Sequence, residues 1–215
     1  MNELDKLRES MKEKDREIIL LLNERSQISV KIGEVKGQKG IDVYDPSQEA
    51  RVYGYLQELN RGPLPPLAIR SIFREIISAS RDVQKPTTVA FLGPEATFSH
   101  LASRLHFGES CRYFAQSGIT RVFDEVEKSV VDWGVVPIEN SQEGSINITL
   151  DRLILTPLQI RAEIYLRINQ CLLSSAEDIK DIKNIYSISP ALGQCQSWLR
   201  TNMPNCILGE VESTA

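Results

Sequence analysis

The chain has 215 residues, of which 41% are hydrophobic and 25% are charged, a composition typical of globular proteins. The formal net charge of -4 lacks the basic excess of a nucleic-acid-binding protein, and no apolar run is long enough to span a membrane. Charged residues from Glu3 onward argue against a signal peptide, so we expect a cytoplasmic protein without membrane or nucleic-acid partners.

The four cysteines, Cys111, Cys171, Cys195 and Cys206, lie far apart and show no C-x-x-C spacing. This distribution disfavours a zinc site or a disulfide framework. We therefore predict reduced thiols and no bound metal.

Residues 3–36 contain no proline and one glycine, Gly33. Apolar residues recur there at helical spacing: Leu4, Leu7, Met11, Ile18, Leu22, Ile28, Ile32 and Val35. The pattern predicts one helix of roughly 34 residues, about 50 Å long at about 1.5 Å per residue. The segment Gly37–Gly40 is expected to end it.

Two shorter helices are predicted next. Asp45 is expected to be the N-cap of the first, with Pro46 in its first turn and Gln48 in the capping-box position, and the helix runs to about Leu59. The second spans 67–84 and is stopped by Pro86. Because one helix far exceeds the other two, a single subunit would leave apolar surface in water, and we expect an interlocked dimer.

The pattern changes near residue 86, which predicts a helical domain over 1–86 and a second domain over 87–215. Strand patterns then alternate with helical ones, which indicates an α/β layer fold with mainly parallel pairing. The expected strands are 89–92, 111–114, 134–138, 160–173, 185–188 and 206–211. The expected helices lie near 98–106, 118–129, 145–155 and 191–201.

Three cations lie on or beside the apolar stripe of the long helix, where burial is costly unless a negative group meets them. Arg25 and Lys36 are eleven residues apart, so they point within roughly 20° of each other across about 16 Å, a gap that a small dianion could fill. Arg8 lies about 25 Å from Arg25 along the helix and could reach only a site in a partner chain.

Other helices add hydrogen-bonding groups that could converge on these cations. Ser80 and Gln84 are four residues apart on the third helix, and Asp45 and Glu49 are four apart on the second. Taken singly, each residue also has a structural explanation, as a cap or as part of an exposed ion pair.

The strings LRESMKEKDREIILLLNERSQISVKIGEVK, VYDPSQE and IFREIISASRDVQ resemble the all-helical chorismate mutase domain across residues 1–85. This resemblance implies an intertwined homodimer with two sites, each using an arginine of the other subunit. It also implies conversion of chorismate to prephenate, a pericyclic rearrangement that needs no cofactor. The family's site positions fall on Arg8, Arg25, Lys36, Asp45, Glu49, Ser80 and Gln84, while Gln48 stands where some members carry arginine.

The same resemblance suggests roles for these residues. Arg8 and Arg25 would hold the substrate carboxylates, which fixes the reactive folded shape. Lys36 and Gln84 would donate hydrogen bonds to the ether oxygen whose bond breaks, and Glu49 would accept one from the ring hydroxyl. Such an arrangement is electrostatically preorganised for the transition state.

Four strand–helix junctions in the second half carry hydroxyl and amide groups suited to carboxylates at helix N-termini, at 93–99, 139–145, 189–194 and 212–215. Together they imply a cleft, although each group is also an ordinary N-cap. The two histidines, His100 and His106, flank an apolar helix face and receive no role.

The strings VAFLGPEATFSHLA, GVVPIENSQEGSINITLD and ALGQCQSWL, with STA at the end, closely resemble prephenate dehydratase. That resemblance implies a two-lobed fold like that of periplasmic binding proteins and conversion of prephenate to phenylpyruvate, and the two halves together indicate a bifunctional enzyme family of phenylalanine biosynthesis. The family positions present are Thr97, Ser99, Asn140, Ser141, Gly144, Ser145 and Gln194.

The family's Thr-Arg-Phe motif and its regulatory domain would follow STA, and the sequence ends first. We therefore expect an incomplete dehydratase attached to a mutase. A second hypothesis stays open: a non-catalytic dimer whose α/β half senses a small carboxylate. Loss of chorismate absorbance would distinguish the two.

Overall fold

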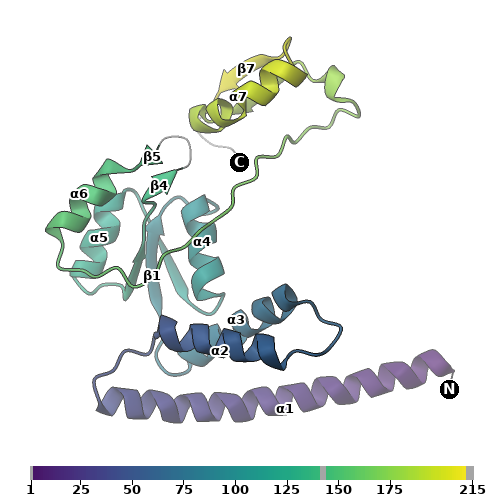
Figure 1. Cartoon of the computed structure of the whole chain (residues 1–215), viewed down its shortest axis with the longest axis vertical. Coiled ribbons are helices and arrows are strands. Elements are labelled where there is room, and N and C mark those ends of the chain that lie inside the picture. Colours follow the sequence, from purple (N-terminus) through teal and green to yellow (C-terminus); the bar gives the residue numbers. More distant parts are fainter. Residues whose placement is uncertain (1, 141–143, 212–215) are drawn as a thin grey trace. The chain divides into compact units, whose positions relative to one another are not determined.

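The computed structural model describes residues 2–140 and 144–211, which form two compact units, residues 1–165 and residues 166–215 (Figure 1). The first unit begins with three helices, α1 (Glu3–Gln38), α2 (Pro46–Leu59) and α3 (Pro66–Asp82). All three predicted helices are thus confirmed. The predicted cap is also present, because Asp45 accepts a hydrogen bond from the backbone N–H of Gln48 at 2.9 Å.

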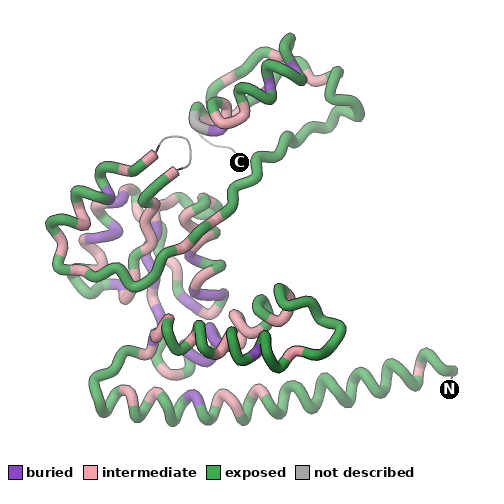
Figure 2. Tube along the Cα trace, in the orientation of Figure 1, coloured by how far each residue is buried: buried purple, intermediate pink, exposed green. Residues whose placement is uncertain are grey.

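α3 packs against both α1 and α2. The covered stripe of α1 repeats at three- and four-residue steps through Arg25, Ser29, Gly33 and Lys36, as an amphipathic helix requires. The N-terminal part of α1 is exposed along almost its whole length (Figure 2), and Leu7 is 62% exposed. The prediction that one chain leaves apolar surface on this helix uncovered is confirmed.

The α/β part of the first unit contains a three-stranded parallel sheet in the order β2-β1-β3. Its elements are β1 (Thr88–Leu92), α4 (Phe98–Phe107), β2 (Arg112–Gln116), α5 (Ile119–Glu127) and β3 (Trp133–Val135). In the register of the sheet, Ala90 of β1 lies opposite Phe114 of β2 and Gly134 of β3. The alternation predicted from residue 86 onward is confirmed over these elements.

β1 is buried on both faces, because helices cover both. Val89 packs in a cluster with Phe107 of α4, while the next residue, Ala90, points to the other face and packs with Val122 of α5. Figure 1 accordingly shows α4 and α5 on opposite sides of β1. Such two-sided burial is typical of a parallel sheet and explains the continuous apolar run of this strand.

The helix predicted near 145–155 is confirmed as α6 (Asn147–Leu155), and the junction before it contains an antiparallel pair that was not predicted, β4 (Glu139–Asn140) with β5 (Gly144–Ser145). One prediction in the following segment is wrong. The segment 160–173 is not a strand. Apolar composition alone predicted it, but a strand also needs a neighbour for its backbone groups, and this segment has no ladder partner within the described ranges 2–140 and 144–211.

The second unit contains a short 3-10 turn η1 (Ile179–Asp181), then β6 (Asn184–Ser187), α7 (Ser189–Asn202) and β7 (Ile207–Glu210). β6 and β7 are parallel, as predicted, and α7 connects them. Ile185, Leu199 and Met203 form the core of this unit.

All four cysteines are free thiols. Within residues 2–140 and 144–211, no helix has the length and apolarity needed to cross a bilayer.

Candidate active site

Two predicted site residues meet where α1 crosses α3. The guanidinium of Arg25 donates a hydrogen bond to the hydroxyl of Ser80, and that hydroxyl donates in turn to the carbonyl of Ile76 at 2.7 Å. Ser80 is buried and Arg25 is half-buried. The contact joins residues 55 positions apart, so helix packing brings them together as the sequence predicted.

Lys36 lies at the C-terminal end of the same covered stripe. Its ammonium donates to the carbonyl oxygens of Val43 at 2.8 Å and Asp42 at 3.1 Å. Neither Lys36 nor Arg25 forms an ion pair with any described residue. Burial lowers the pKa of the Arg25 guanidinium from its usual value, with no carboxylate opposing it. These two cations are therefore partly desolvated and not neutralised.

Gln84 lies four residues after Ser80, in the turn that follows α3. Its amide nitrogen donates to the carbonyl of Ser80 at 2.9 Å, and its amide oxygen is buried with no partner in the described parts of the chain. The side chain packs on Gly33, where an added Cβ would lie 2.8 Å from the Gln84 Cγ. The close approach of α1 to α3 thus depends on a glycine at this position.

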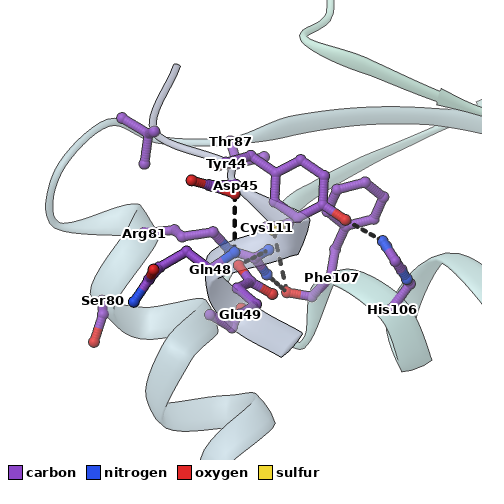
Figure 3. Close-up of polar contacts among 12 residues, drawn as sticks. Tyr44, Asp45, Gln48, Glu49, Ser80, Arg81, Thr87, His106, Phe107 and Cys111 are labelled. Carbon is purple, nitrogen blue, oxygen red and sulfur yellow. Dashed lines mark hydrogen bonds and ion pairs between the residues drawn. The ribbon is translucent and has the colours of Figure 1, made fainter. Parts of the chain in front are cut away.

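The predicted residues of α2 behave differently. Asp45 caps its helix, and Gln48 is exposed. Glu49 turns to α3 and forms an ion pair with Arg81 at 2.9 Å (Figure 3). No hydrogen bond or ion pair joins Glu49 to Arg25 or Lys36 among the described residues, so the structure shows two neighbouring polar clusters instead of one.

Arg81 was not among the predicted site residues. Its side chain is only 5% exposed, and it contacts Glu49, the carbonyl of Phe107 and the rings of Tyr44 and Phe107. An arginine on an amphipathic helix is ordinarily expected to reach solvent. In the sequence, only its place next to Ser80 set Arg81 apart. That place does not reveal that α4 covers this side of α3 and buries the arginine.

Arg8 is not brought to the other cations in the single chain. Its side chain is 67% exposed, and its ion pair is with Asp5 on the same helix at 3.9 Å. The prediction that Arg8 cannot reach the site of its own subunit agrees with this position, and its contribution to a partner's site stays a prediction.

The residues predicted from the dehydratase resemblance lie in both units. In the first, Thr97 is the N-cap of α4, with its hydroxyl accepting from the backbone N–H of His100 at 3.3 Å, and Ser99 is half-buried in the first turn. Asn140 lies on β4, whereas Gly144 and Ser145 form β5. In the second unit, Gln194 accepts a hydrogen bond from Gln170 at 2.7 Å. Ser141 and the junction at 212–215 lie outside the described residues.

The fold and site together define a protein of two parts. A three-helix segment carries two cations that form no ion pair with any described residue, and a parallel sheet covered by helices on both faces follows it. Cations held apart from carboxylates are suited to binding a small anion.

Comparison with known proteins identifies the family. The chain belongs to the prephenate dehydratase family, whose family model matches residues 89–215, and a chorismate mutase type II model matches residues 7–85. A bifunctional chorismate mutase/prephenate dehydratase of Aquifex aeolicus is 42% identical over 219 residues, which cover 100% of this chain and 60% of the relative. The chain spans 55% to 60% of the length of the first curated relatives it matches.

Two solved structures are similar to parts of the chain. Chorismate mutase (Form II) from Thermus thermophilus is 36% identical with a TM-score of 0.39, covering 39% of this chain and 96% of that one. The prephenate dehydratase from Staphylococcus aureus is 33% identical with a TM-score of 0.46, covering 60% of this chain and 48% of that one.

Proposed function

We propose that the helical segment is a chorismate mutase, which converts chorismate to prephenate by pericyclic rearrangement. The observation that carries this proposal is the pair of partly desolvated cations, Arg25 and Lys36, which no described carboxylate neutralises. A dicarboxylate would supply the missing negative charge. The match of residues 7–85 to the chorismate mutase type II model supports this substrate.

The residues of this segment would act by orientation and electrostatics. Arg25 would hold a substrate carboxylate, and Lys36 and Gln84 would donate to the ether oxygen as the bond breaks. Ser80 positions the Arg25 guanidinium through their hydrogen bond. Glu49 would accept the ring hydroxyl, with Asp45 and Gln48 beside it at the start of α2. This chemistry needs no cofactor.

We infer that the site is completed in a homodimer, where Arg8 of one subunit would reach the site of the other. The apolar side chains exposed along the N-terminal part of α1 support this assembly, because burial would stabilise them. The free thiols support a reducing, cytoplasmic location.

We further propose that the boundary near residue 86 separates this mutase domain from a partial dehydratase domain, which in a complete enzyme would act on prephenate in phenylalanine biosynthesis. The two family matches, ending at residue 85 and starting at residue 89, support the boundary. Some of the family positions Thr97, Ser99, Asn140, Ser141, Gly144 and Ser145 in the first unit, and Gln194 in the second, would contact substrate, each considered within its own unit. Bifunctional relatives support the pairing of activities, since the product of the first domain is the substrate of the second.

The mutase proposal is tested by the loss of chorismate absorbance on adding the purified chain. We expect a rate well above the uncatalysed background. Arg25→Met and Lys36→Met should each lower kcat/KM at least about 100-fold, because each removes a charge that acts in the transition state.

The matched control is Lys31→Met, which removes an exposed cation of the same helix. It should leave the rate near that of the wild type. If the wild-type chain binds chorismate without accelerating its rearrangement, the chain is a carboxylate-binding protein and the mutase proposal is wrong.

A further inference from the structure

α3 carries polar groups on two faces. One face holds Ser80 beside α1, with Gln84 in the turn that follows α3, where the proposed mutase cations lie. The other face holds Glu75, Ser78 and Arg81, whose partners lie at the C-terminal end of α4, in the segment matched by the dehydratase model. α3 therefore contacts both the rest of the helical segment and the α/β segment of the first unit.

The contact between α3 and the turn after α4 is closely fitted. The carboxylate of Glu75 accepts from the backbone N–H of Glu109 at 2.8 Å, and the hydroxyl of Ser78 accepts from that of Ser110 at 3.2 Å. Gly108 has a φ of +81°, and a Cβ there would lie 2.5 Å from the Ser78 Cβ. Only glycine allows this backbone to approach α3 so closely.

Arg81 connects this turn to the proposed mutase site. One terminal nitrogen of its guanidinium donates to Glu49 at 2.9 Å, and the other donates to the carbonyl of Phe107. The rings of Tyr44 and Phe107 lie 5.2 and 5.7 Å from the guanidinium carbon, within cation–π range. The planar fork of arginine can satisfy both acceptors at once, which a lysine ammonium at the end of a flexible stem does less well.

We propose that Arg81 is a positioning residue of the mutase site, which holds the Glu49 carboxylate ionised and oriented while being anchored itself to the Phe107 carbonyl of the dehydratase-family segment. The inference rests on the proposed mutase function, because Glu49 has a substrate role only there. It adds that the α/β segment supports the geometry of a catalytic carboxylate in the helical segment.

The surroundings of Glu49 determine how the proposal can be tested. Burial raises the pKa of the Glu49 carboxyl above its usual value, and Arg81 opposes that rise most strongly, through both its charge and its hydrogen bond. Asp45 raises this pKa and Lys36 lowers it, by smaller effects. Glu49 also lines a cavity of about 430 Å³. The other titratable or charged side chains that line this cavity are Tyr44, Tyr53, Arg70, Arg74 and His106. Arg81 is the cation hydrogen-bonded to the carboxylate.

The test compares pH profiles of mutase kcat/KM for the wild type, Arg81→Met and Arg81→Lys. Activity should fall on the acid side as Glu49 becomes protonated. Since Arg81 lowers the Glu49 pKa, its removal in Arg81→Met should move this acid limb upward by about 1 to 3 pH units. Arg81→Lys keeps a positive charge, but lysine contacts Glu49 and the Phe107 carbonyl together less well than arginine. Its acid limb should therefore lie between those of the wild type and Arg81→Met. Adding Glu49→Gln to Arg81→Met should abolish the limb.

The matched control is Arg152→Met. Arg152 resembles Arg81, because it pairs with Asp124 at 2.9 Å, lies over the ring of Phe123 and has a buried Nε without a partner among the described residues. It belongs to the α/β segment alone, so its removal should change stability without moving the acid limb.

The outcomes separate the two proposals. An inactive wild-type chain would refute the mutase function itself. An active wild type whose acid limb is unmoved in both Arg81 variants would overturn the positioning role while leaving the mutase function intact. If Arg81→Met does not fold, the pH profile of Arg81→Lys tests the proposal. An acid limb and a kcat/KM equal to those of the wild type would overturn it.

Discussion

At the scale of single residues, Gln84 has the least satisfied side chain of the proposed mutase site. Its amide oxygen is buried without a partner in the described parts of the chain, while its nitrogen faces the carbonyl of Ser80. An amide can donate at this position at any ordinary pH. A carboxylate of the same shape could donate only when protonated.

Gln84→Glu should therefore shift the mutase optimum to acid pH. Burial disfavours the ionised carboxylate, and the Ser80 carbonyl would repel it, so the active form is the protonated acid. The measurement is kcat against pH for the variant and the wild type. A variant profile that coincides with that of the wild type would contradict a donor role for Gln84.

Helical spacing was sufficient to predict part of this site. Arg25 and Ser80 lie on facing stripes of two helices, with Gln84 in the turn that follows α3, and periodicity together with packing brings such stripes into contact. The ion pair of Glu49 with Arg81 could not be predicted in the same way. It depends on α4 covering the far side of α3, and no pattern within either helix encodes that contact.

At the scale of elements, the crossing of α1 over α3 depends on Gly33. A Cβ at this position would lie 2.8 Å from the Cγ and 2.9 Å from the Cβ of Gln84. Gly37, one turn later on the same helix, has no atom within 4 Å of the corresponding position. The two glycines therefore separate the effect of crowding from the effect of helix propensity.

Gly33→Ala should lower mutase activity at least about 10-fold and destabilise the fold by about 1 kcal/mol, because overpacking outweighs the gain in helix propensity. Gly37→Ala should leave the activity unchanged and stabilise the fold by up to about 1 kcal/mol. Urea unfolding and the chorismate assay measure both quantities. Equal behaviour of the two variants would show that the helices do not need this close approach.

Whether a helix or strand could be predicted from the sequence depended on the interactions that form it. Helices and the buried parallel strands were predicted because hydrogen bonding within the helix, or burial on both faces, leaves a local pattern. The pairing of 139–140 with 144–145 was not predicted, and the strand predicted over 160–173 is absent. Strand formation there is decided by the availability of a neighbouring strand, which an apolar run does not reveal.

At the scale of the whole molecule, α1 exposes a row of apolar side chains to solvent. Leu4, Leu7, Met11 and Ile18 are each more than half exposed, and Arg8 lies among them with only a long ion pair to Asp5. Burial of such a stripe stabilises association by roughly 25 cal/mol per Å² of apolar surface. In an isologous dimer, the same contact would bring each Arg8 to the other subunit.

Arg8→Met and Arg25→Met should therefore complement each other. Each variant alone should be nearly inactive, because every site lacks one arginine. Co-expression of the two should restore about one quarter of the wild-type activity, since half of randomly paired dimers are mixed and each mixed dimer has one intact site.

The control for complementation is co-expression of Lys36→Met with Arg25→Met. Both residues belong to the same subunit's part of the site, so each site of a mixed dimer still lacks either Arg25 or Lys36, and no recovery of activity is expected. Absence of any recovery with Arg8→Met, together with a monomeric mass in sedimentation, would refute the shared site.

The sequence by itself determined the helices, the alternation of strands and helices, and which cations share a helix face. Those features arise from local periodicity, capping and turn chemistry, which neighbouring residues encode. Only the tertiary structure decided that Glu49 pairs with Arg81, that α4 closes over α3, and that 160–173 forms no strand. These depend on contacts between segments distant in sequence, whose free energy comes from desolvation and fit that no single segment contains.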